Sequence, residues 1–345
     1  MQGTCEEGVV LVGGDARQRF YDARGYGRPG DDGLELAPVE AAHLLYRGDL
    51  EAVDGMGFRE YLASVAHLGP RFLVYKDLRD RGFYLSPARE GWVADPEGVD
   101  LVVYPRGSGP WDDAVAYRVR TVAERDRVPA SSLDGVVLAV VDEESEITYF
   151  ETGTPDFESG PTVETEPVAA TLLDDRVVAW APPAALHRRG FFGQPLDDRD
   201  HREGEAPLQL SLLEAAYLAA EGRLAVAGAD PGETLERLVD RGRAVEGDRF
   251  DRRLRAYRAL RDRGLTPKTG FKFGADFRVY EGVESVDSLG HALYLVRVLP
   301  PDFAFSPRDL ALDVRLAHGV RKRMIFARDT ANGEIDWLSA SRLTP

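Results

Sequence analysis

The chain has 345 residues, of which 43 are Lys or Arg and 59 are Asp or Glu, so its formal net charge at pH 7 is −16. Apolar residues make up 43% and aromatic residues 9%, which is enough to build packed cores and excludes a wholly disordered chain. No stretch approaches the roughly 20 apolar residues of a membrane helix, and no secretory signal is visible at the start. The length predicts about two domains or more, and we expect a cytoplasmic protein.

The basic residues are strongly biased toward arginine. Only four of them are lysines, at positions 76, 268, 272 and 322. An acid-rich, lysine-poor composition is typical of cytoplasmic proteins from high-salt organisms, because an anionic surface keeps such chains in solution. The net charge therefore describes the habitat and does not exclude nucleic acid as a ligand.

Cysteine and histidine usage argues against a metal centre. The single cysteine, Cys5, cannot form an internal disulfide or a cysteine-rich zinc site. The six histidines show no His-Glu-x-x-His pair or similar ligand spacing. We expect no metal and no cofactor.

Segments of the first half recur in the second half in the same order. Residues 36–50, LAPVEAAHLLYRGDL, match residues 210–224, LSLLEAAYLAAEGRL, at seven of fifteen positions. Three further pairs follow this pattern: 25–29 with 190–195, YKDLRDRG at 75–82 with YRALRDRG at 257–264, and 103–107 with 279–282. Ordered matches at offsets of 165 to 182 predict a tandem duplication.

Each repeat is predicted to begin with a small helix-containing part. A strand, at residues 8–12 or 176–180, precedes the helix with the sequence EAA. The second copy of this helix has a capping box, because Ser211 precedes Glu214 by three residues. A second helix is expected at residues 58–81 and at residues 250–263.

A strand-rich part follows in each repeat, so we expect the α+β (mixed α/β) fold class. An amphipathic helix is predicted at residues 308–320. The expected strands are 100–104, 116–122 and 136–141 in the first repeat, and 277–280, 294–299, 324–327 and 334–338 in the second. The predicted organisation is an N-terminal subdomain at 1–82, a strand-rich subdomain at 83–151, a linker at 152–167, a second N-terminal subdomain at 168–264 and a second strand-rich subdomain at 265–345.

The two copies differ in the side chains they carry. The second gathers Tyr280, His291 and Lys322 at expected strand or helix ends, with Lys268, Lys272 and Arg278 nearby in sequence. In a chain almost without lysine, Lys322 indicates a specific role, such as stabilising charge that develops on a phosphoryl oxygen.

The first copy lacks this set. Alignment places Tyr104 opposite Tyr280, Ala114 opposite His291 and Gly135 opposite Lys322. One copy with a Tyr, His and Lys set and one with only the Tyr are typical of a duplicated enzyme with one inactive site.

At these positions the sequence resembles the archaeal tRNA-intron (splicing) endonuclease family, in its two-repeat homodimeric form. The resemblance is most specific over KTGFKFGADFRVY at 268–280, HALYLV at 291–296 and VRLAHGVRK at 314–322. It implies an endonuclease-type fold for the strand-rich subdomains, with the second repeat catalytic and the first degenerate. It also implies a metal-independent RNA endonuclease that cuts precursor tRNA at both exon–intron junctions in a bulge-helix-bulge motif.

The resemblance also assigns roles to the three residues. Tyr280 would be the base that takes the ribose 2′ proton, His291 the acid that protonates the 5′ oxygen, and Lys322 the group that stabilises the phosphorane. The products would carry 2′,3′-cyclic phosphate and 5′-hydroxyl ends. An imidazole suits the acid role because it titrates near neutrality.

Two further sets are implied by the resemblance. Arg315 and Arg342 lie where the family places arginines that sandwich a bulge base, which is a known way to bind unpaired RNA bases. Asp142, Glu143 and Glu144 lie in a loop of the first repeat that, in this family, docks into a basic pocket of the partner subunit. His318 matches a family position without a role, and a packing function is expected for it.

Two alternatives remain open. A metal-dependent nuclease would use acids such as Asp276 or Asp100 with Lys272, and would need a divalent ion. A non-catalytic RNA-binding subunit would have no need to keep Tyr280, His291 and Lys322. Cleavage without a metal ion would exclude the metal-dependent nuclease, and any specific cleavage would exclude the non-catalytic subunit.

Overall fold

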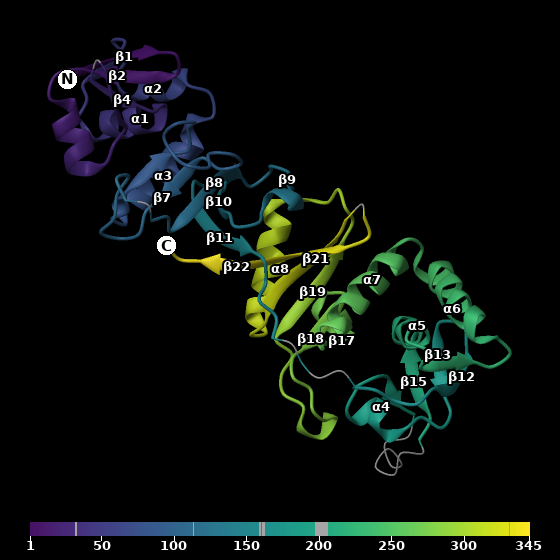
Figure 1. Cartoon of the computed structure of the whole chain (residues 1–345). Coiled ribbons are helices and arrows are strands. Elements are labelled where there is room, and N and C mark those ends of the chain that lie inside the picture. The colour runs from purple at the N-terminus through teal and green to yellow at the C-terminus, as the bar shows by residue number, and fades with distance from the viewer. Residues whose placement is uncertain (32, 113, 159, 161–162, 197–205, 331) are drawn as a thin grey trace. The chain divides into compact units, whose positions relative to one another are not determined.

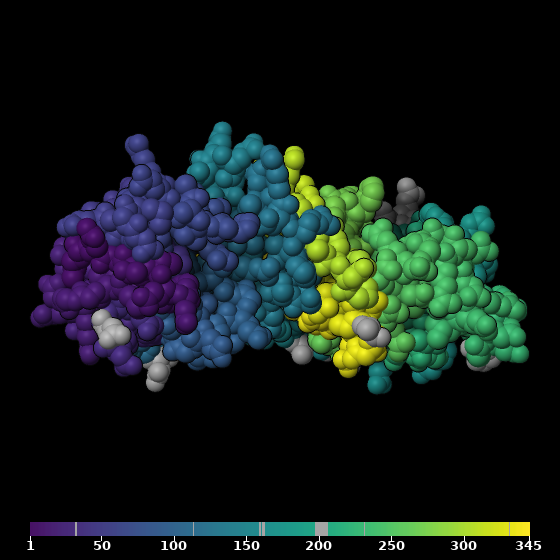
Figure 2. Space-filling view, turned by 90° about the horizontal axis from the view of Figure 1, so that it is seen from above, coloured from purple at the N-terminus to yellow at the C-terminus, as the bar shows by residue number. Residues whose placement is uncertain are grey.

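The computed structural model describes the chain except for residues 32, 113, 159, 161–162, 197–205 and 331 (Figure 1). It contains two compact units. Unit 1 comprises Met1–Gly153 with Ala304–Ala311 and Ala340–Pro345, and unit 2 comprises Thr154–Phe303 with Leu312–Ser339. Figure 2 shows the surface of these segments, with the N-terminal residues in purple and the C-terminal residues in yellow.

Unit 1 begins with a five-stranded sheet in the order β3-β4-β2-β1-β5, which is packed against helices. Its elements are β1 (Gln2–Glu6), β2 (Val9–Val12), the π-helix Arg17–Asp22, β3 (Arg28–Gly30), β4 (Gly33–Leu36), α1 (Pro38–Arg47), β5 (Ala52–Val53), α2 (Phe58–Ser64) and α3 (Leu68–Asp80). The strands β6-β7-β8-β10-β11 then lie side by side in a second sheet, which α3 contacts. These strands are β6 (Leu85–Pro87), β7 (Leu101–Val103), β8 (Tyr117–Ala123), β10 (Val137–Val141) and β11 (Ile147–Gly153).

Unit 2 repeats this plan. Its first sheet has the order β14-β15-β13-β12-β16 and its second runs β17-β18-β19-β21-β22. The first part contains β12 (Val168–Leu172), β13 (Arg176–Ala179), α4 (Ala184–Arg188), β14 (Gln194–Pro195), β15 (Leu208–Ser211), α5 (Leu212–Ala220), β16 (Leu224–Val226), α6 (Pro231–Glu246) and α7 (Arg249–Asp262). The second contains β17 (Thr266–Thr269), β18 (Phe277–Tyr280), β19 (Tyr294–Leu299) and β21 (Arg323–Asp329). It also contains residues 312–319 of α8 (Pro307–Gly319) and residues 335–339 of β22 (Ile335–Leu343), whose other residues belong to unit 1.

The parallel crossover differs between the repeats. The strands β19 and β21 are parallel, and α8 connects them. The strands β8 and β10 are also parallel, but their shorter connection holds only β9 (Val128–Pro129) and a 3-10 turn at Ala130–Ser132. The first repeat therefore lacks a counterpart of the helix that leads into Lys322.

A buried polar arrangement recurs in both N-terminal parts. Glu40 accepts hydrogen bonds from the backbone amides of Gly27 (2.7 Å) and Ala37 (2.9 Å). Glu214 accepts the equivalent bonds from Gly193 (3.0 Å) and Ser211 (2.9 Å). Each carboxylate fixes a helix start and a loop at once, because it satisfies amides from both.

A buried arginine also recurs. The Arg79 guanidinium donates to the Arg24 carbonyl and lies 3.9 Å from the Tyr26 ring centroid. Arg261 donates to the Gly190 carbonyl, and its guanidinium lies 3.9 Å from the Phe192 ring centroid. These matching contacts, together with the two sheet orders, confirm the predicted fold class of two tandem α+β repeats.

Several predicted boundaries need correction. The helix predicted at residues 58–81 is two helices, α2 and α3, because His67 between them has a left-handed backbone with φ 56°. The elements that were not predicted include the helices α4 and α6 and the strands β1, β11 and β12. The linker predicted at residues 152–167 begins inside β11, and its residues 159, 161 and 162 lie outside the described residues. Among the described helices, none is long and apolar enough to cross a membrane.

Candidate active site

The strands β18, β19 and β21 lie side by side, and their register aligns Tyr280 with Lys322 across one end of the sheet. In the register of unit 2, Val279 pairs with Tyr294 and Tyr294 pairs with Arg323. One position further out, the backbone amide of Leu293 donates to the Val279 carbonyl, and the Leu293 carbonyl accepts from Arg323. Tyr280 and Lys322 therefore flank position 293 from its two sides.

Tyr280 ends β18 with its ring buried. The side chain is 6% exposed and packs with Phe191 and Ala292. The Phe191 ring makes an edge contact with a centroid distance of 5.7 Å, and the Arg278 guanidinium lies 5.7 Å from the Tyr280 centroid. The phenol is thus held by apolar contacts with a cation beside its ring.

Lys322 is fixed by backbone geometry and by one hydrogen bond. Arg321 has a left-handed φ of 56°, which turns the chain from α8 into β21. The Lys322 ammonium donates to the Ala292 carbonyl (Nζ–O 2.9 Å) and lies 5.7 Å from the Phe273 ring centroid. The charge is therefore held above the backbone that joins His291 to β19.

His291 lies three residues before the first residue of β19 and is exposed. Its neighbour Ala292 packs with Tyr280 through its side chain and accepts from Lys322 through its carbonyl. Ala292 thus links the three predicted residues at one edge of the sheet. The arrangement offers a phenol, an imidazole open to solvent and an ammonium, which are groups suited to acid–base chemistry with charge stabilisation.

The first repeat has a different set at the equivalent edge. Tyr104 holds the position of Tyr280, and its hydroxyl donates to Ser86 Oγ (2.8 Å). The Val137–Val119 pair matches the Ile325–Val296 pair, which places Asp134 at the position of Lys322. The sequence alignment, which placed Gly135 there, is therefore wrong by one residue. The first repeat carries a carboxylate where the second carries an ammonium.

The two predicted base-stacking arginines lie in different units. Arg315 is exposed on α8, within the part of that helix that belongs to unit 2. Arg342 is exposed on β22, within the residues that belong to unit 1. His318 is exposed at the last turn of α8, which contradicts the packing role expected for it.

The predicted acidic loop is an ordered turn between β10 and β11. Asp142 Oδ1 accepts from the backbone amides of Glu144 (3.0 Å) and Glu146 (2.8 Å). Glu143 and Glu144 are exposed, and Glu143 pairs with Arg125 (2.5 Å). Asp142 therefore closes the turn, and Glu143 and Glu144 are the acids that it exposes. The equivalent loop at 328–334 includes residue 331, which lies outside the described residues.

The acids that a metal-dependent alternative would use already have partners. Asp276 is 7% exposed, pairs with Arg249 (2.6 Å) and accepts from the Val298 amide (2.8 Å). Asp100 pairs with Arg71 (2.8 Å) and accepts from the Thr121 amide (2.8 Å). In each repeat the acid pairs with an arginine and accepts from a backbone amide, which favours a structural role for both acids. The described residues contain no group of three or more His, Cys, Asp or Glu that could hold a metal ion.

Lys268, which the sequence grouped with the catalytic candidates, is a structural residue. Its ammonium bonds Glu214 (2.6 Å) and the carbonyl of Phe191 (3.1 Å). Burial raises the pKa of Glu214, but the Lys268 charge and the hydrogen bonds to the carboxylate outweigh it and lower the pKa to about 2. Lys268 therefore anchors the Phe191 loop on which Tyr280 packs. Sequence reasoning missed this link because the two segments are far apart in the chain.

The fold and the site define a duplicated α+β chain whose second repeat carries Tyr280, His291 and Lys322 at one sheet edge. The model of the tRNA intron endonuclease N-terminal domain matches residues 1–62 and again 168–239, and that of the catalytic C-terminal domain matches residues 250–337. A tRNA-splicing endonuclease of Haloferax volcanii is 61% identical over 350 residues, and one of Haloarcula marismortui is 58% identical over 346, each covering 100% of both chains. One of Methanosarcina acetivorans is 39% identical over 369 residues, covering 99% of both chains.

The chain belongs to the tRNA intron endonuclease family. The Haloferax and Haloarcula relatives agree with the high-salt habitat that the composition indicated.

Proposed function

We propose that the chain is a cytoplasmic endonuclease that cuts precursor tRNA at both exon–intron junctions, within a bulge-helix-bulge motif and without a metal ion. The observation that carries the proposal is the convergence of Tyr280, His291 and Lys322 at one sheet edge, through their shared contacts with Ala292 and its neighbours. The relatives named tRNA-splicing endonuclease support precursor tRNA as the substrate.

The proposed reaction is an internal transfer at one phosphate. Tyr280 takes the proton of the ribose 2′-hydroxyl, whose oxygen attacks the adjacent phosphorus. The bond from phosphorus to the 5′ oxygen breaks, and His291 donates a proton to that oxygen. Lys322 stabilises the negative charge on the phosphorane oxygens. The products are a 2′,3′-cyclic phosphate and a 5′-hydroxyl, with no net consumption of water.

The first repeat is proposed to be inactive at its equivalent edge. It offers no imidazole at position 114, and Asp134 would repel a phosphate where Lys322 attracts one. The proposed duty of this repeat is assembly. Arg315 and Arg342 are proposed to hold a bulge base, and both side chains are exposed and so accessible to RNA.

The acidic loop is proposed to join two copies of the chain into a homodimer. Replacement of Asp142, Glu143 and Glu144 by their amides removes three charges but keeps the Asp142 Oδ1 acceptor that builds the turn. We expect this variant to sediment as a monomer at concentrations where the wild type is a dimer. Amides at Glu233, Glu236 and Asp240, three exposed acids of α6, make a control of equal charge. Equal sedimentation of wild type and loop variant would contradict the assembly role.

Cleavage with and without metal separates the proposal from its alternatives. We expect the wild type to cut a labelled bulge-helix-bulge RNA twice in excess EDTA. The 3′ ends should resist removal of their phosphate by a phosphatase until the cyclic phosphate is opened, and the 5′ ends should accept a phosphate from a kinase. Cleavage that requires added divalent ion would indicate a carboxylate-held metal. Binding without cleavage under every condition would indicate an RNA-binding subunit.

A further inference from the structure

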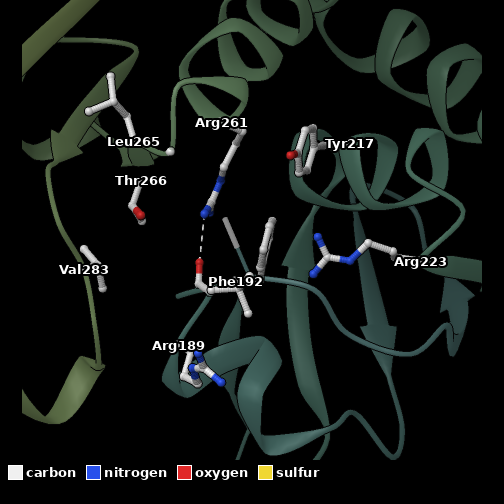
Figure 3. Close-up of a pocket in the computed structure, with 11 residues that line it drawn as sticks. Arg189, Phe192, Tyr217, Arg223, Arg261, Leu265, Thr266 and Val283 are labelled. Atoms are coloured by element: carbon white, nitrogen blue, oxygen red, sulfur yellow. Dashed lines mark hydrogen bonds between the residues drawn. The ribbon is translucent and has the colours of Figure 1, made fainter. Parts of the chain in front are cut away.

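A small cavity in unit 2 is lined by cationic and aromatic side chains (Figure 3). Its volume is about 30 Å³. The lining includes Arg189, Phe192, Tyr217, Arg223, Arg261 and Thr266. None of these residues belongs to the proposed acid–base set.

Arg261 brings an unpaired hydrogen-bond donor to this cavity. The residue is 7% exposed, its Nη1 donates to the Gly190 carbonyl (2.8 Å), and its Nε donates to the Tyr257 hydroxyl (3.0 Å). Its Nη2 is buried and has no hydrogen-bond partner among the described residues. An unpaired buried donor on a charged group is costly, so the site favours an acceptor.

Comparison with the first repeat explains why this donor is free. The equivalent Arg79 Nη2 donates to the Gly25 carbonyl (3.3 Å) and to the Tyr75 hydroxyl (2.9 Å). In unit 2 the carbonyl equivalent to that of Gly25 belongs to Phe191, and it accepts from Lys268 (3.1 Å). The lysine present only in the second repeat has therefore taken the acceptor that the arginine uses in the first.

The charge around the cavity also changed between the repeats. Arg223 holds the position of Asp49, which pairs with Arg24 (2.7 Å) and Arg47 (3.0 Å) in unit 1. Arg223 donates to the Thr165 hydroxyl (2.9 Å), and within the described part of the chain it forms no ion pair. Burial lowers the pKa of Arg223, as does the positive charge of Arg261, while the nearby Glu221 and Glu164 act in the opposite direction. Two guanidinium groups, one buried and one half-buried, thus line one cavity.

Both guanidinium groups face the same aromatic ring. The Arg261 Cζ lies 3.9 Å from the Phe192 ring centroid and the Arg223 Cζ lies 5.7 Å from it. Figure 3 shows the Arg261 side chain descending from above and the Arg223 side chain extending toward Phe192 from the right. Mutual repulsion of two such cations would be relieved by an anion near both of them.

We propose that this cavity binds a single halide ion, chloride in the cell, which accepts from Arg261 Nη2 and neutralises the charge shared with Arg223. A cavity needs about 10–15 Å³ to hold one water-sized particle. A volume of about 30 Å³ therefore accommodates one monoatomic anion.

Thermal unfolding of the full chain in two sodium salts tests the proposal. At equal concentration, we expect the wild-type Tm to be higher in chloride than in gluconate by about 2–4 °C, because a ligand that binds only the folded state stabilises it. Arg223→Gln should lose most of this chloride-specific difference. Arg237→Gln, which breaks only an exposed α6 pair with Glu233 (3.1 Å), should keep it. Equal Tm values for the wild type in both salts, or equal differences in both variants, would overturn the proposal.

Crystals grown in sodium bromide give a direct measurement that does not depend on stability. We expect an anomalous peak within hydrogen-bond distance of Arg261 Nη2 in the wild type, and its loss in Arg223→Gln. A wild-type crystal without this peak would overturn the proposal, as would a carboxylate from another copy of the chain in the cavity.

Discussion

At the residue scale, Glu40 and Glu214 show how one buried position behaves in two electrostatic settings. Both carboxylates accept two backbone amides at a helix start. Glu214 also has the Lys268 ammonium at 2.6 Å, whereas the position equivalent to Lys268 in the first repeat is Ser86. Burial raises the pKa of Glu40 to about 7, although its two amide bonds act in the opposite direction.

This shift gives the first repeat a distinct pH dependence. Because the folded-state pKa of Glu40 lies above the unfolded value of about 4.3, the folded state prefers the protonated acid. Its contribution to the free energy of unfolding is complete below about pH 4 and is lost as the pH rises through 7. Glu214 has the opposite sign: its contribution is present above about pH 4.3 and is lost as the pH falls toward 2.

We expect Glu40→Gln to remove this pH-dependent loss. Between pH 5 and 8.5, the free energy of unfolding of the wild type should fall by about 2–3 kcal/mol relative to the variant, measured by denaturant titration. The comparison uses the change in the free energy of unfolding with pH and not its value at one pH. The reason is that the glutamine side chain has one acceptor oxygen where Glu40 has two, which adds a loss that does not depend on pH. Glu60→Gln is the matched control, because Glu60 holds the same cap position in α2 but is exposed. A constant difference between wild type and Glu40→Gln across this range would disprove the assignment.

The residues of the candidate site could be named from motifs, but their contacts could not. The lysine-poor background singled out Lys322, and the motif spacing singled out Tyr280 and His291. Ala292 has no chemistry that a sequence pattern would reveal, yet it links Tyr280 and Lys322. Asp134 was missed in favour of Gly135 because only the strand register locates a one-residue shift in a loop.

At the element scale, local signals predicted most of the described α-helices but fewer than half of the described strands. The capping box at Ser211 and Glu214 is present and begins α5. A signal for the break at His67 was available in Gly69-Pro70, since a Pro inside a helical pattern marks the start of a new helix or the end of the preceding one. A signal for α6 was available in Asp230-Pro231, since Pro is favoured in the first turn of a helix.

The contact between α6 and α7 depends on a glycine. A Cβ at Gly242 would lie 2.3–2.4 Å from the Phe250 ring, which is fully buried. We expect Gly242→Ala to lower the free energy of unfolding by about 1–3 kcal/mol through overpacking, measured by denaturant titration.

Gly232 provides the control in the same helix. A Cβ there would have no neighbour within 4 Å. Gly232→Ala should therefore be neutral or stabilising by up to about 1 kcal/mol, because alanine favours the helix. Similar destabilisation by both substitutions would show that the Phe250 contact is not the cause.

At the scale of the whole molecule, the two repeats differ in their parallel crossover and in one loop. The second repeat has α8, which leads into Lys322, whereas the first joins its parallel strands by a short turn. The first repeat instead presents an ordered acidic loop. The sequence predicted the duplication because its motifs are local, but the loss of the crossover helix became visible only in the strand order.

A high salt concentration would affect how the molecule binds RNA. Exposed charges are screened over about 3 Å in molar salt, so phosphate contacts alone would be weak there. A buried or backbone-fixed cation such as Lys322 is screened less than an exposed one. Recognition is then expected to depend on RNA shape and base stacking.

The most direct test of the central claim is cleavage of an end-labelled bulge-helix-bulge RNA in high salt with excess EDTA by wild type, His291→Ala and His318→Ala. His318 is a matched control, since it is an exposed histidine of the same unit that lies on α8. Loss of a positioned general acid typically lowers the rate by about 10²–10⁴-fold. We predict such a loss for His291→Ala, with two cuts retained by the wild type and by His318→Ala. Equal rates for all three proteins would contradict the account.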